Sequence, residues 1–444
     1  MADQSPPQSS APRPSGPSIL AASLVGTSIE WYDYYIFGTA AALAFGTVFF
    51  SAASPVAGTL AAFATFAVGF AARPLGAAII GHFGDRIGRK SMLVLTLLLT
   101  GGATTLIGVL PTYAAIGVGA PLLLVLLRII QGFGVGGEWG GAVLIATEHA
   151  SAGRRALYGS FAQFGVPIGV LTSNLAFLAV SGLSNEDFLA YGWRIPFLIS
   201  VVLVVVGLLV RTRLRDAPEF ARVKESREVT KVPFAELVRT EPKALVLAGL
   251  AAIAPPAIGY TVIVYLLSYG TKVVGYTRPT LLTLILVSTA LWIAAIAASA
   301  VLSDRYGAKR VYVWGAVTTV VWPVPMFALV DTGNVGLALV AVLVAAVVQG
   351  LMAGAQGGLY TELFPVRVRY SGISIAYTVG GVIGGAVTPL VATALQAAGG
   401  SIVVALYLTA LCLAGLVAAI MLPARGPGRA GAGAPEPSAA EAAP

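Results

Sequence analysis

The sequence predicts an all-α integral membrane protein with twelve transmembrane helices, arranged as two pseudo-symmetric six-helix bundles. Three observations predict this class: the composition, the length of the apolar runs and an internal duplication. Of the 444 residues, 57% are hydrophobic and only 10% are charged, whereas soluble domains carry about 25% charged residues. Because so few charges cannot cover a surface that faces water, we expect lipid to cover much of it.

The apolar runs have the length of membrane-spanning helices. A helix needs roughly 20 apolar residues to cross about 30 Å of hydrocarbon, and it satisfies its own backbone hydrogen bonds in lipid. The alternating pattern of a β-barrel is not seen. In the first half the predicted spans are 19–48, 57–80, 91–111, 121–146, 156–180 and 193–212. In the second half they are 244–270, 280–302, 311–330, 336–360, 372–396 and 401–422.

Polar segments set the expected domain boundaries. The basic stretch 213–243 forms a central cytoplasmic loop between an N-terminal bundle, 19–212, and a C-terminal bundle, 244–422. The ends, 1–18 and 423–444, are rich in Pro, Ser, Ala and Gly, which predicts disordered tails. The first of these lacks the features of a signal peptide.

The distribution of Lys and Arg predicts the orientation. With the N-terminus inside, only Arg194, Lys272 and Arg278 fall in the loops on the outer side. Basic loops stay cytoplasmic, so we expect a multi-pass protein of the bacterial plasma membrane with both termini cytoplasmic. The net charge of +8 fits anionic lipid headgroups better than nucleic acid.

Two loop motifs recur in the two halves. Gly84-Asp85-Arg86-Ile87-Gly88-Arg89-Lys90 after the second span matches Ser303-Asp304-Arg305-Tyr306-Gly307-Ala308-Lys309 after the eighth. Thr147-Glu148 after the fourth span matches Thr361-Glu362 after the tenth, each with Arg seven residues beyond the Glu. Duplicated six-helix halves are typical of secondary transporters, whose substrate site lies between the halves.

The first loop motif suits a gate. Its glycines permit a tight turn, and its basic residues hold orientation. The residues assigned to this motif are Gly81, Gly84, Asp85, Arg86, Gly88, Arg89 and Lys90, with Asp304, Arg305, Glu148 and Glu362 as repeated members. The alternative is an anchor that only fixes topology. Ala308 stands where the first copy has Arg89, so the latch is not fully symmetric.

These motifs resemble the major facilitator superfamily. The run Glu30-Trp31-Tyr32-Asp33-Tyr34-Tyr35, with Arg73-Pro74-Leu75-Gly76, Arg128-Ile129-Ile130-Gln131-Gly132 and Gly136-Gly137-Glu138-Trp139, is similar to its metabolite:proton symporter family. The resemblance spans residues 20–422. It implies proton-driven uptake of compounds such as dicarboxylates, oxoglutarate, citrate, shikimate, proline or betaine, without choosing among them.

Two acids lie near the middle of the first span. An ionisable group at mid-helix costs roughly 2.5–3.5 kcal/mol on insertion scales, so such groups are candidates for function. Glu30 and Asp33 are three apart and share a helix face. Two close carboxylates repel each other, which favours proton uptake by one of them. We therefore expect proton coupling at Glu30 or Asp33; the alternative is that one acid pairs with Arg and only shapes the bundle.

Arg128 in the fourth span is the expected partner of these acids. It shares a face with Gln131, and Tyr34 lies beside Glu30. An arginine stays charged and needs a partner, so Arg128 is expected to exchange between an acid and a substrate carboxylate. The alternative is a permanent structural ion pair. Arg73 and Glu138 are expected to form a separate pair near the cytoplasmic gate.

The second half offers polar groups without deep charges. We assign substrate contacts to Tyr260, Gln349, Gln356 and Tyr377, together with Gln163 of the first half. Gln349 and Gln356 are seven apart and share a face. In this interpretation the first half handles protons and charge and the second half reads substrate shape; the alternative is simple packing.

The sequence therefore predicts a proton-coupled symporter for an organic acid or a zwitterionic osmolyte, working as a monomer by alternating access. An antiporter, an efflux carrier or a uniporter uses the same fold, and a non-transporting sensor is a remote alternative. An enzyme, a metal site and a cofactor are not expected, because no P-loop, metal-ligand cluster or nucleophile–His–acid set is visible. The single cysteine, Cys412, lies in an apolar run.

Overall fold

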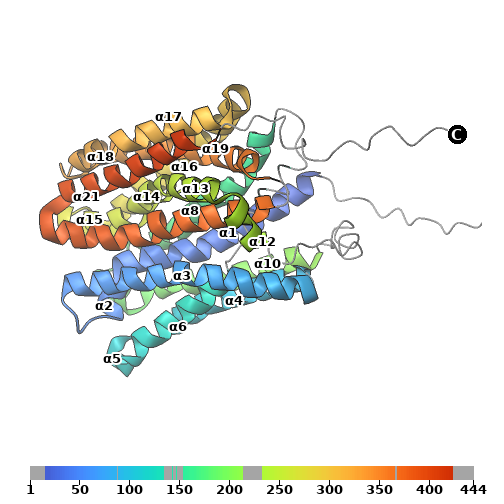
Figure 1. Cartoon of the computed structure of the whole chain (residues 1–444). Helices are drawn as coiled ribbons and strands as arrows, with labels where there is room; N and C mark the ends of the chain where they lie inside the picture. Colours follow the sequence, from blue (N-terminus) through green and yellow to red (C-terminus); the bar gives the residue numbers. More distant parts are fainter. Residues whose placement is uncertain are drawn as a thin grey trace, which may run out of the picture.

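The structure is a computed structural model that describes residues 16–87, 89–134, 143, 147, 154–213, 233–365 and 368–423. Within this part, the regular elements are helices that run roughly parallel or antiparallel to one axis (Figure 1). Side chains are described except those of 16–23, 77, 78, 80–87, 89–93, 155, 210–213 and 233–236.

The N-terminal bundle holds the first six long helices. The first is α1 (Gly16–Ala40), which continues through the π-helical turn η1 (Ala41–Phe45) into α2 (Gly46–Val48). The others are α3 (Pro55–Ile87), α4 (Arg89–Val109), α6 (Gly119–Gly134), α8 (Arg155–Ala179) and α10 (Arg194–Arg213). Short elements α5 (Tyr113–Ile116), α9 (Asn185–Asp187) and η2 (Phe188–Gly192) connect them.

The C-terminal bundle repeats this plan with more breaks. Its first span is α13 (Pro242–Ala251), α14 (Ala254–Tyr260), η3 (Thr261–Tyr265), α15 (Leu266–Tyr269) and η4 (Gly270–Val274). Then come α16 (Arg278–Tyr306), α17 (Ala308–Val321) with α18 (Pro323–Val330), and α19 (Val335–Leu363). The last two spans are α20 (Arg369–Gly380) with η6 (Gly381–Ala386), and α21 (Val387–Met421).

Local sequence explains the breaks. Proline lacks the amide that continues a helix, and α17 and α18 meet at 46° just before Pro323. Gly400 has φ +77°, which separates the eleventh and twelfth spans inside α21. The helices η1 and η3 occupy equivalent places in the first and seventh spans, and π turns inside helices are frequent at functional sites.

The predicted fold class is confirmed, with differences in length. Within the described residues, seven helices are long and apolar enough to cross a membrane, and α17 with α18 forms an eighth. The helix α3 runs to Ile87, well past the predicted end at residue 80. The helix α12 (Pro233–Thr240) falls inside the predicted central loop, and α1 begins inside the predicted first tail. Most of both tails and of the central stretch lie outside the described residues.

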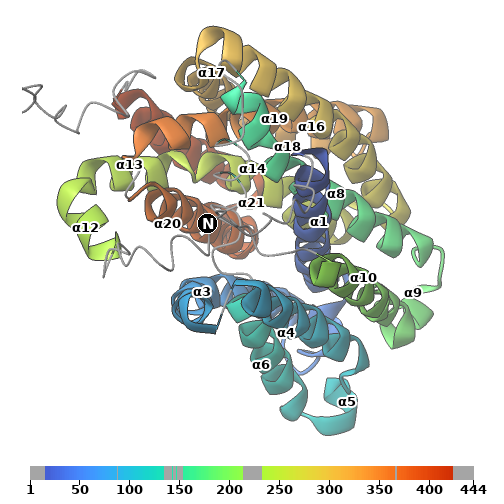
Figure 2. The same cartoon turned by 90° about the vertical axis from the view of Figure 1, so that its right-hand side faces the viewer.

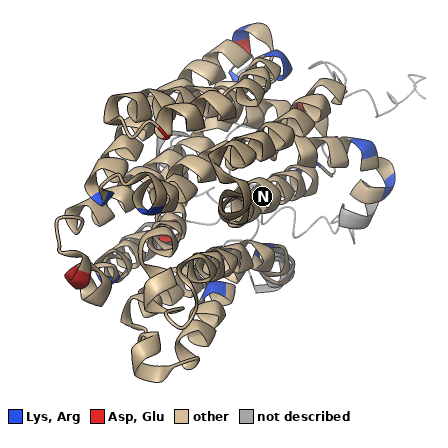
Figure 3. Ribbon diagram, turned by 90° about the vertical axis from the view of Figure 1, so that its left-hand side faces the viewer, with Lys and Arg blue, Asp and Glu red and all other residues tan. Residues whose placement is uncertain are grey.

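The outer surface suits lipid. Leu198, Val202, Val205 and Leu209 on α10 are exposed, although they are apolar. Most of the charged residues visible in Figure 3 lie at or near helix ends. Lipid contact explains both observations, because it removes the cost of exposing apolar side chains to water.

The two bundles meet along two seams, which Figure 2 shows nearly end-on. The helix α8 packs against α16 and α19, and α3 packs against α21 and η6. On the first seam Gly159 and Gly357 bring the backbones of α8 and α19 together. A Cβ atom added at Gly357 would lie 3.0 Å from the carbonyl oxygen of Gly159 and 3.4 Å from its Cα. The absence of a side chain at Gly357 is therefore what lets the two backbones approach so closely here.

This contact predicts that a disulfide will lock the bundles together. A Cβ atom at either Gly159 or Gly357 lies within 3.7 Å of the Cα atom of the other residue, so cysteines there, in a background where Cys412 is replaced by Ala, are close enough for a disulfide. Oxidation of the double variant is expected to cross-link the bundles and stop uptake in proteoliposomes, and reduction is expected to restore it. Each single variant is the control. Full cross-linking with undiminished uptake would show that this seam does not open.

Candidate functional site

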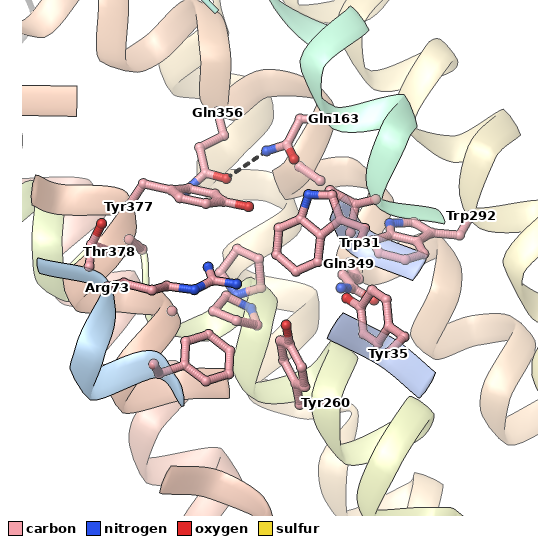
Figure 4. Close-up of a pocket in the computed structure, with 17 residues that line it drawn as sticks. Trp31, Tyr35, Arg73, Gln163, Tyr260, Trp292, Gln349, Gln356, Tyr377 and Thr378 are labelled. Carbon is pink, nitrogen blue, oxygen red and sulfur yellow. Dashed lines mark hydrogen bonds between the residues drawn. The ribbon is translucent and has the colours of Figure 1, made fainter. Parts of the chain in front are cut away.

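A cavity of about 50 Å³ lies between the bundles. By this measure one water molecule needs roughly 10–15 Å³, so the cavity has room for only a few. Figure 4 shows the lining side chains converging from both halves. From the N-terminal bundle they are Trp31, Tyr35, Phe70, Arg73, Gln163 and Val166, and from the C-terminal bundle Ala252, Pro255, Pro256, Tyr260, Trp292, Gln349, Ala353, Gln356, Tyr377, Thr378 and Gly381.

Arg73 is the only charged residue among the described residues that line the cavity. Its side chain is 9% exposed. The guanidinium carbon lies 5.5 Å from the ring centre of Trp31, 4.2 Å from that of Tyr34 and 4.6 Å from that of Phe70. Its Nε and Nη2 have no hydrogen-bond partner within the described part of the chain. The cavity wall thus contains a fixed cation, two of whose nitrogens are buried without a partner in the described structure.

The pairing of Arg73 with Glu138 near the cytoplasmic gate stays a prediction. The helix α3 has 33 residues and continues for four turns beyond Arg73. Arg73 lies 18 residues after the first residue of α3, Pro55, which is roughly 27 Å along the helix axis. Glu138 lies outside the described residues.

Amide side chains join the two bundles beside Arg73. Gln163 of α8 donates through Nε2 to Oε1 of Gln356 on α19, at 3.0 Å. Gln356 in turn lies 3.4 Å from the hydroxyl of Tyr360, which donates to the carbonyl of Ala248 at 2.9 Å. The cavity wall on this side is therefore held by a chain of polar contacts that crosses from one bundle to the other.

Aromatic rings form most of the remaining wall. Trp31 stacks on Tyr35 with 5.5 Å between ring centres, and Tyr35 stacks across the bundle boundary on Tyr260, also at 5.5 Å. The hydroxyl of Tyr260 and Nε1 of Trp292 are buried without a hydrogen-bond partner in the described structure. A ligand here would meet apolar faces and several unused donors.

A second polar cluster is sealed inside the N-terminal bundle. Arg128 is completely buried; its Nη1 donates to Gln131, and its Nη2 lies 3.4 Å from the carbonyl oxygen of Phe66. Gln131 donates to Thr104 at 2.8 Å and to the backbone carbonyl of Asp33 at 3.2 Å. Gly69 makes room for this cluster, because a Cβ atom there would lie 2.4 Å from Nε of Arg128.

The two acids of α1 face different surroundings. Asp33 is buried and accepts a hydrogen bond from Ser200 on α10 at 2.8 Å, while its other carboxylate oxygen accepts none of normal geometry. Glu30 is half-buried and interacts electrostatically with Arg73 and Tyr34. The two acids therefore have different partners: Asp33 meets Ser200 of α10, and Glu30 acts on Arg73.

The structure brings only part of the predicted site to the cavity. Gln163, Tyr260, Gln349, Gln356 and Tyr377 line it; Glu30, Asp33, Tyr34, Arg128 and Gln131 do not. The expected contact between Arg128 and an acid is replaced by Gln131 and a carbonyl oxygen. The prediction missed Tyr35 and Phe70, although Tyr35 lies four residues from Trp31 and Phe70 three from Arg73, spacings that share a helix face.

The second copy of the loop motif bridges the bundles. Asp304, near the end of α16, accepts hydrogen bonds from the backbone amides of Ala156 at 2.9 Å and Leu157 at 3.1 Å, at the start of α8. A carboxylate is favourable at a helix N-terminus. Arg305 is exposed and lies over the ring of Tyr306, and Glu362 is exposed.

The first copy of the motif is described only in part. The backbones of Gly81, Gly84, Asp85 and Arg86 are helical in α3, and those of Arg89 and Lys90 in α4. Their side chains, and the residues Gly88 and Glu148, lie outside the described part.

The bundles are also bridged at the opposite end of the molecule. Nζ of Lys272 donates to the hydroxyl of Thr59 at 3.0 Å. Arg278 donates to the side chain of Asn185 at 3.0 Å and lies 3.6 Å above the ring of Phe188. The cavity therefore has contacts between the bundles on both sides of it.

The profile of the Major Facilitator Superfamily matches residues 23–389. The inner membrane metabolite transport protein YhjE of Escherichia coli (strain K12) is 41% identical, over 91% of this chain and 93% of its own length. The shikimate transporter of the same organism is 40% identical, over 90% and 93%. The proline/betaine transporter of Salmonella typhimurium (strain LT2) is 31% identical, over 91% and 83%.

Solved structures show the same fold at low identity. A crystal structure of a D-xylose-proton symporter superposes with a TM-score of 0.71 at 19% identity, covering 92% of this chain and 98% of that one. A partially occluded inward-open form of the xylose transporter XylE from E. coli gives 0.70 at 16% identity, covering 91% and 96%.

The bridge at Asp304 yields a prediction. Asp304→Ala removes the carboxylate from the start of α8, which is expected to cost about 1–2 kcal/mol and to lower the thermal unfolding midpoint in detergent. It is also expected to speed thiol labelling of a cysteine at Ala353, in the Cys412→Ala background. Arg305→Ala is the matched control, because it changes the neighbouring charge without touching α8. Equal midpoints and labelling rates in both variants would contradict the bridging role.

Proposed function

Because the chain belongs to the Major Facilitator Superfamily, whose members among its relatives are transporters and not enzymes, we propose that it is a proton-coupled symporter. It carries a small polar metabolite across the bacterial plasma membrane by alternating access. The observation that carries this proposal is the cavity between the bundles, with its single cation, Arg73.

Arg73 favours a substrate that bears a carboxylate. A guanidinium matches a carboxylate in charge and in shape, and two of its nitrogens are without protein partners in the described structure. The unused donors of Tyr260 and Trp292 suit hydroxyl or carbonyl oxygens on the same molecule. Among the substrates named for the relatives, an organic acid such as shikimate uses all of these donors.

A zwitterionic osmolyte fits less well. A quaternary ammonium is bound by aromatic faces, but faces of Trp31, Tyr34 and Phe70 already hold the guanidinium of Arg73. The positive charge of the ligand would also face that of Arg73. We therefore propose an organic acid as the substrate class and betaine-like compounds as weaker ligands.

The proton is proposed to bind at one of the two acids of α1. Carboxyl groups this deep in a membrane helix are energetically costly, so those that are present are candidates for a functional role. Asp33 has a carboxylate oxygen to spare, and Glu30 acts on the cavity cation Arg73. In this proposal Arg128 keeps its charge within the sealed cluster, and Arg73, instead of Arg128, contacts the substrate.

Alternating access is supported by how the bundles touch. The cavity is lined by residues of both bundles, so a relative movement of the bundles would change access to it. The contacts at Asp304 and at Lys272 and Arg278 lie at opposite ends and suit the two gates. From the basic loops, we propose that the end with Asp304 is cytoplasmic, as are both termini.

The function is tested in proteoliposomes of purified protein with an imposed pH gradient. Uptake of labelled shikimate is expected to rise when the outside is acidic and to fall when an uncoupler collapses the gradient. Betaine and proline are compared under the same conditions. Uptake that is indifferent to the gradient would exclude symport and favour a uniporter, whereas uptake driven by the reverse gradient would favour an antiporter.

Arg73 supplies the sharpest single test. Arg73→Gln removes a charge-assisted hydrogen bond of about 1.5–3 kcal/mol, so KM for an anionic substrate is expected to rise about tenfold or more. Arg73→Lys keeps the charge without the planar fork and is expected to be intermediate. Arg194→Gln is the control, because Arg194 donates to the carbonyls of Gly108 and Leu110, away from the cavity. An unchanged KM in Arg73→Gln would remove Arg73 from the site.

A further inference from the structure

Tyr34 lies between the cavity and the sealed cluster. Its side chain is completely buried. The guanidinium carbons of Arg73 and of Arg128 each lie 4.2 Å from its ring centre. The two cations are therefore no farther apart than twice that distance, in the middle of a membrane bundle.

The two arginines have unequal access to the cavity. Arg73 lines it, whereas Arg128 is 0% exposed and donates to Gln131, which in turn donates to Thr104 and to the backbone carbonyl of Asp33. The cavity cation, the ring, the sealed cation and Gln131 thus form one continuous series of contacts, which ends at the backbone of the residue that carries the buried acid. Tyr34 is the step in this series that touches both cations.

Like charges repel strongly where water is excluded. An aromatic ring offsets this repulsion in part, because its faces carry partial negative charge that attracts a cation. An anion that reaches Arg73 cancels one of the two charges and so lowers the free energy of Arg128 as well. The charged groups that act on Tyr34 are Arg128, Arg73 and Glu30.

We propose that Tyr34 is a positioning residue that couples the cavity cation Arg73 to the sealed cluster of Arg128, Gln131 and Asp33. The aromatic ring, and not the hydroxyl, performs this role by holding both guanidinium groups. Through it, the charge state of the cavity acts on the cluster that contains the buried acid. The consequence for transport rests on the proposed function; the coupling of the two arginines does not.

The first test needs no substrate. Tyr34→Leu is expected to lower the thermal unfolding midpoint of the full-length protein by roughly 2–4 °C or more. Adding Arg73→Met is expected to restore part of that loss, because one of the two repelling charges is gone. Phe37→Leu is the matched control: Phe37 also lies 4.2 Å from Arg128, but its ring holds no contact with Arg73 in the described structure. Arg73→Met is therefore not expected to rescue Phe37→Leu.

The second test separates ring from hydroxyl. Tyr34→Phe keeps the ring and is expected to retain the wild-type ratio of shikimate uptake at acidic and neutral pH. Tyr34→Leu is expected to reduce that ratio about tenfold, a typical coupling between sites, beyond any loss in the amount of folded protein.

Three results would overturn the proposal. The first is that Tyr34→Leu and Arg73→Met change the unfolding midpoint additively, and the second is that Arg73→Met rescues Phe37→Leu equally well. The third is that Tyr34→Phe lowers the uptake ratio as much as Tyr34→Leu does. Absence of shikimate uptake by the unaltered protein would instead count against the proposed function. The unfolding midpoints of Tyr34→Leu, Arg73→Met and the double variant would still decide the role of Tyr34.

Discussion

The burial of two guanidinium groups in one bundle is the constraint on which the rest of the site depends. Arginine does not release its proton readily, so both charges persist where lipid and packed helices exclude water. The protein surrounds them with aromatic faces, and Gln131 and the carbonyl of Phe66 lie against Arg128 while Glu30 acts on Arg73. A cation held in this way keeps part of its electrostatic potential uncompensated. That uncompensated potential would lower the free energy of an anion that binds at Arg73.

The same constraint explains why small residues are concentrated in these helices. Gly69 leaves the space that Arg128 fills, and Gly159 and Gly357 let the bundles approach to backbone contact. Association of helices in membranes depends on such close packing and on few polar contacts. Contacts like those of Asp304 with α8 join the two bundles and not the helices within either one, so breaking them would leave each bundle intact.

The sequence predicted the fold well because hydrophobic length and loop charge act locally along the chain. It predicted the site less well because two features depend on rotation about helix axes. Asp33 and Glu30 are three residues apart, yet one turns toward α10 and the other acts on Arg73. Arg73 and Arg128 are both buried, yet only Arg73 lines the cavity. Which neighbours a side chain meets depends on the register between helices, and that register does not follow from periodicity alone.

The internal duplication has diverged in chemistry while it kept its geometry. The N-terminal bundle supplies the cavity cation and the buried acids, and the C-terminal bundle supplies amides, Trp292 and Tyr260. A substrate whose carboxylate binds Arg73 would have its remaining atoms against the C-terminal bundle. The two bundles are close together here, since Gln163 of one donates a hydrogen bond to Gln356 of the other. Charge would then determine whether a compound binds, shape would determine which one, and closure of the bundles would require both to be satisfied together.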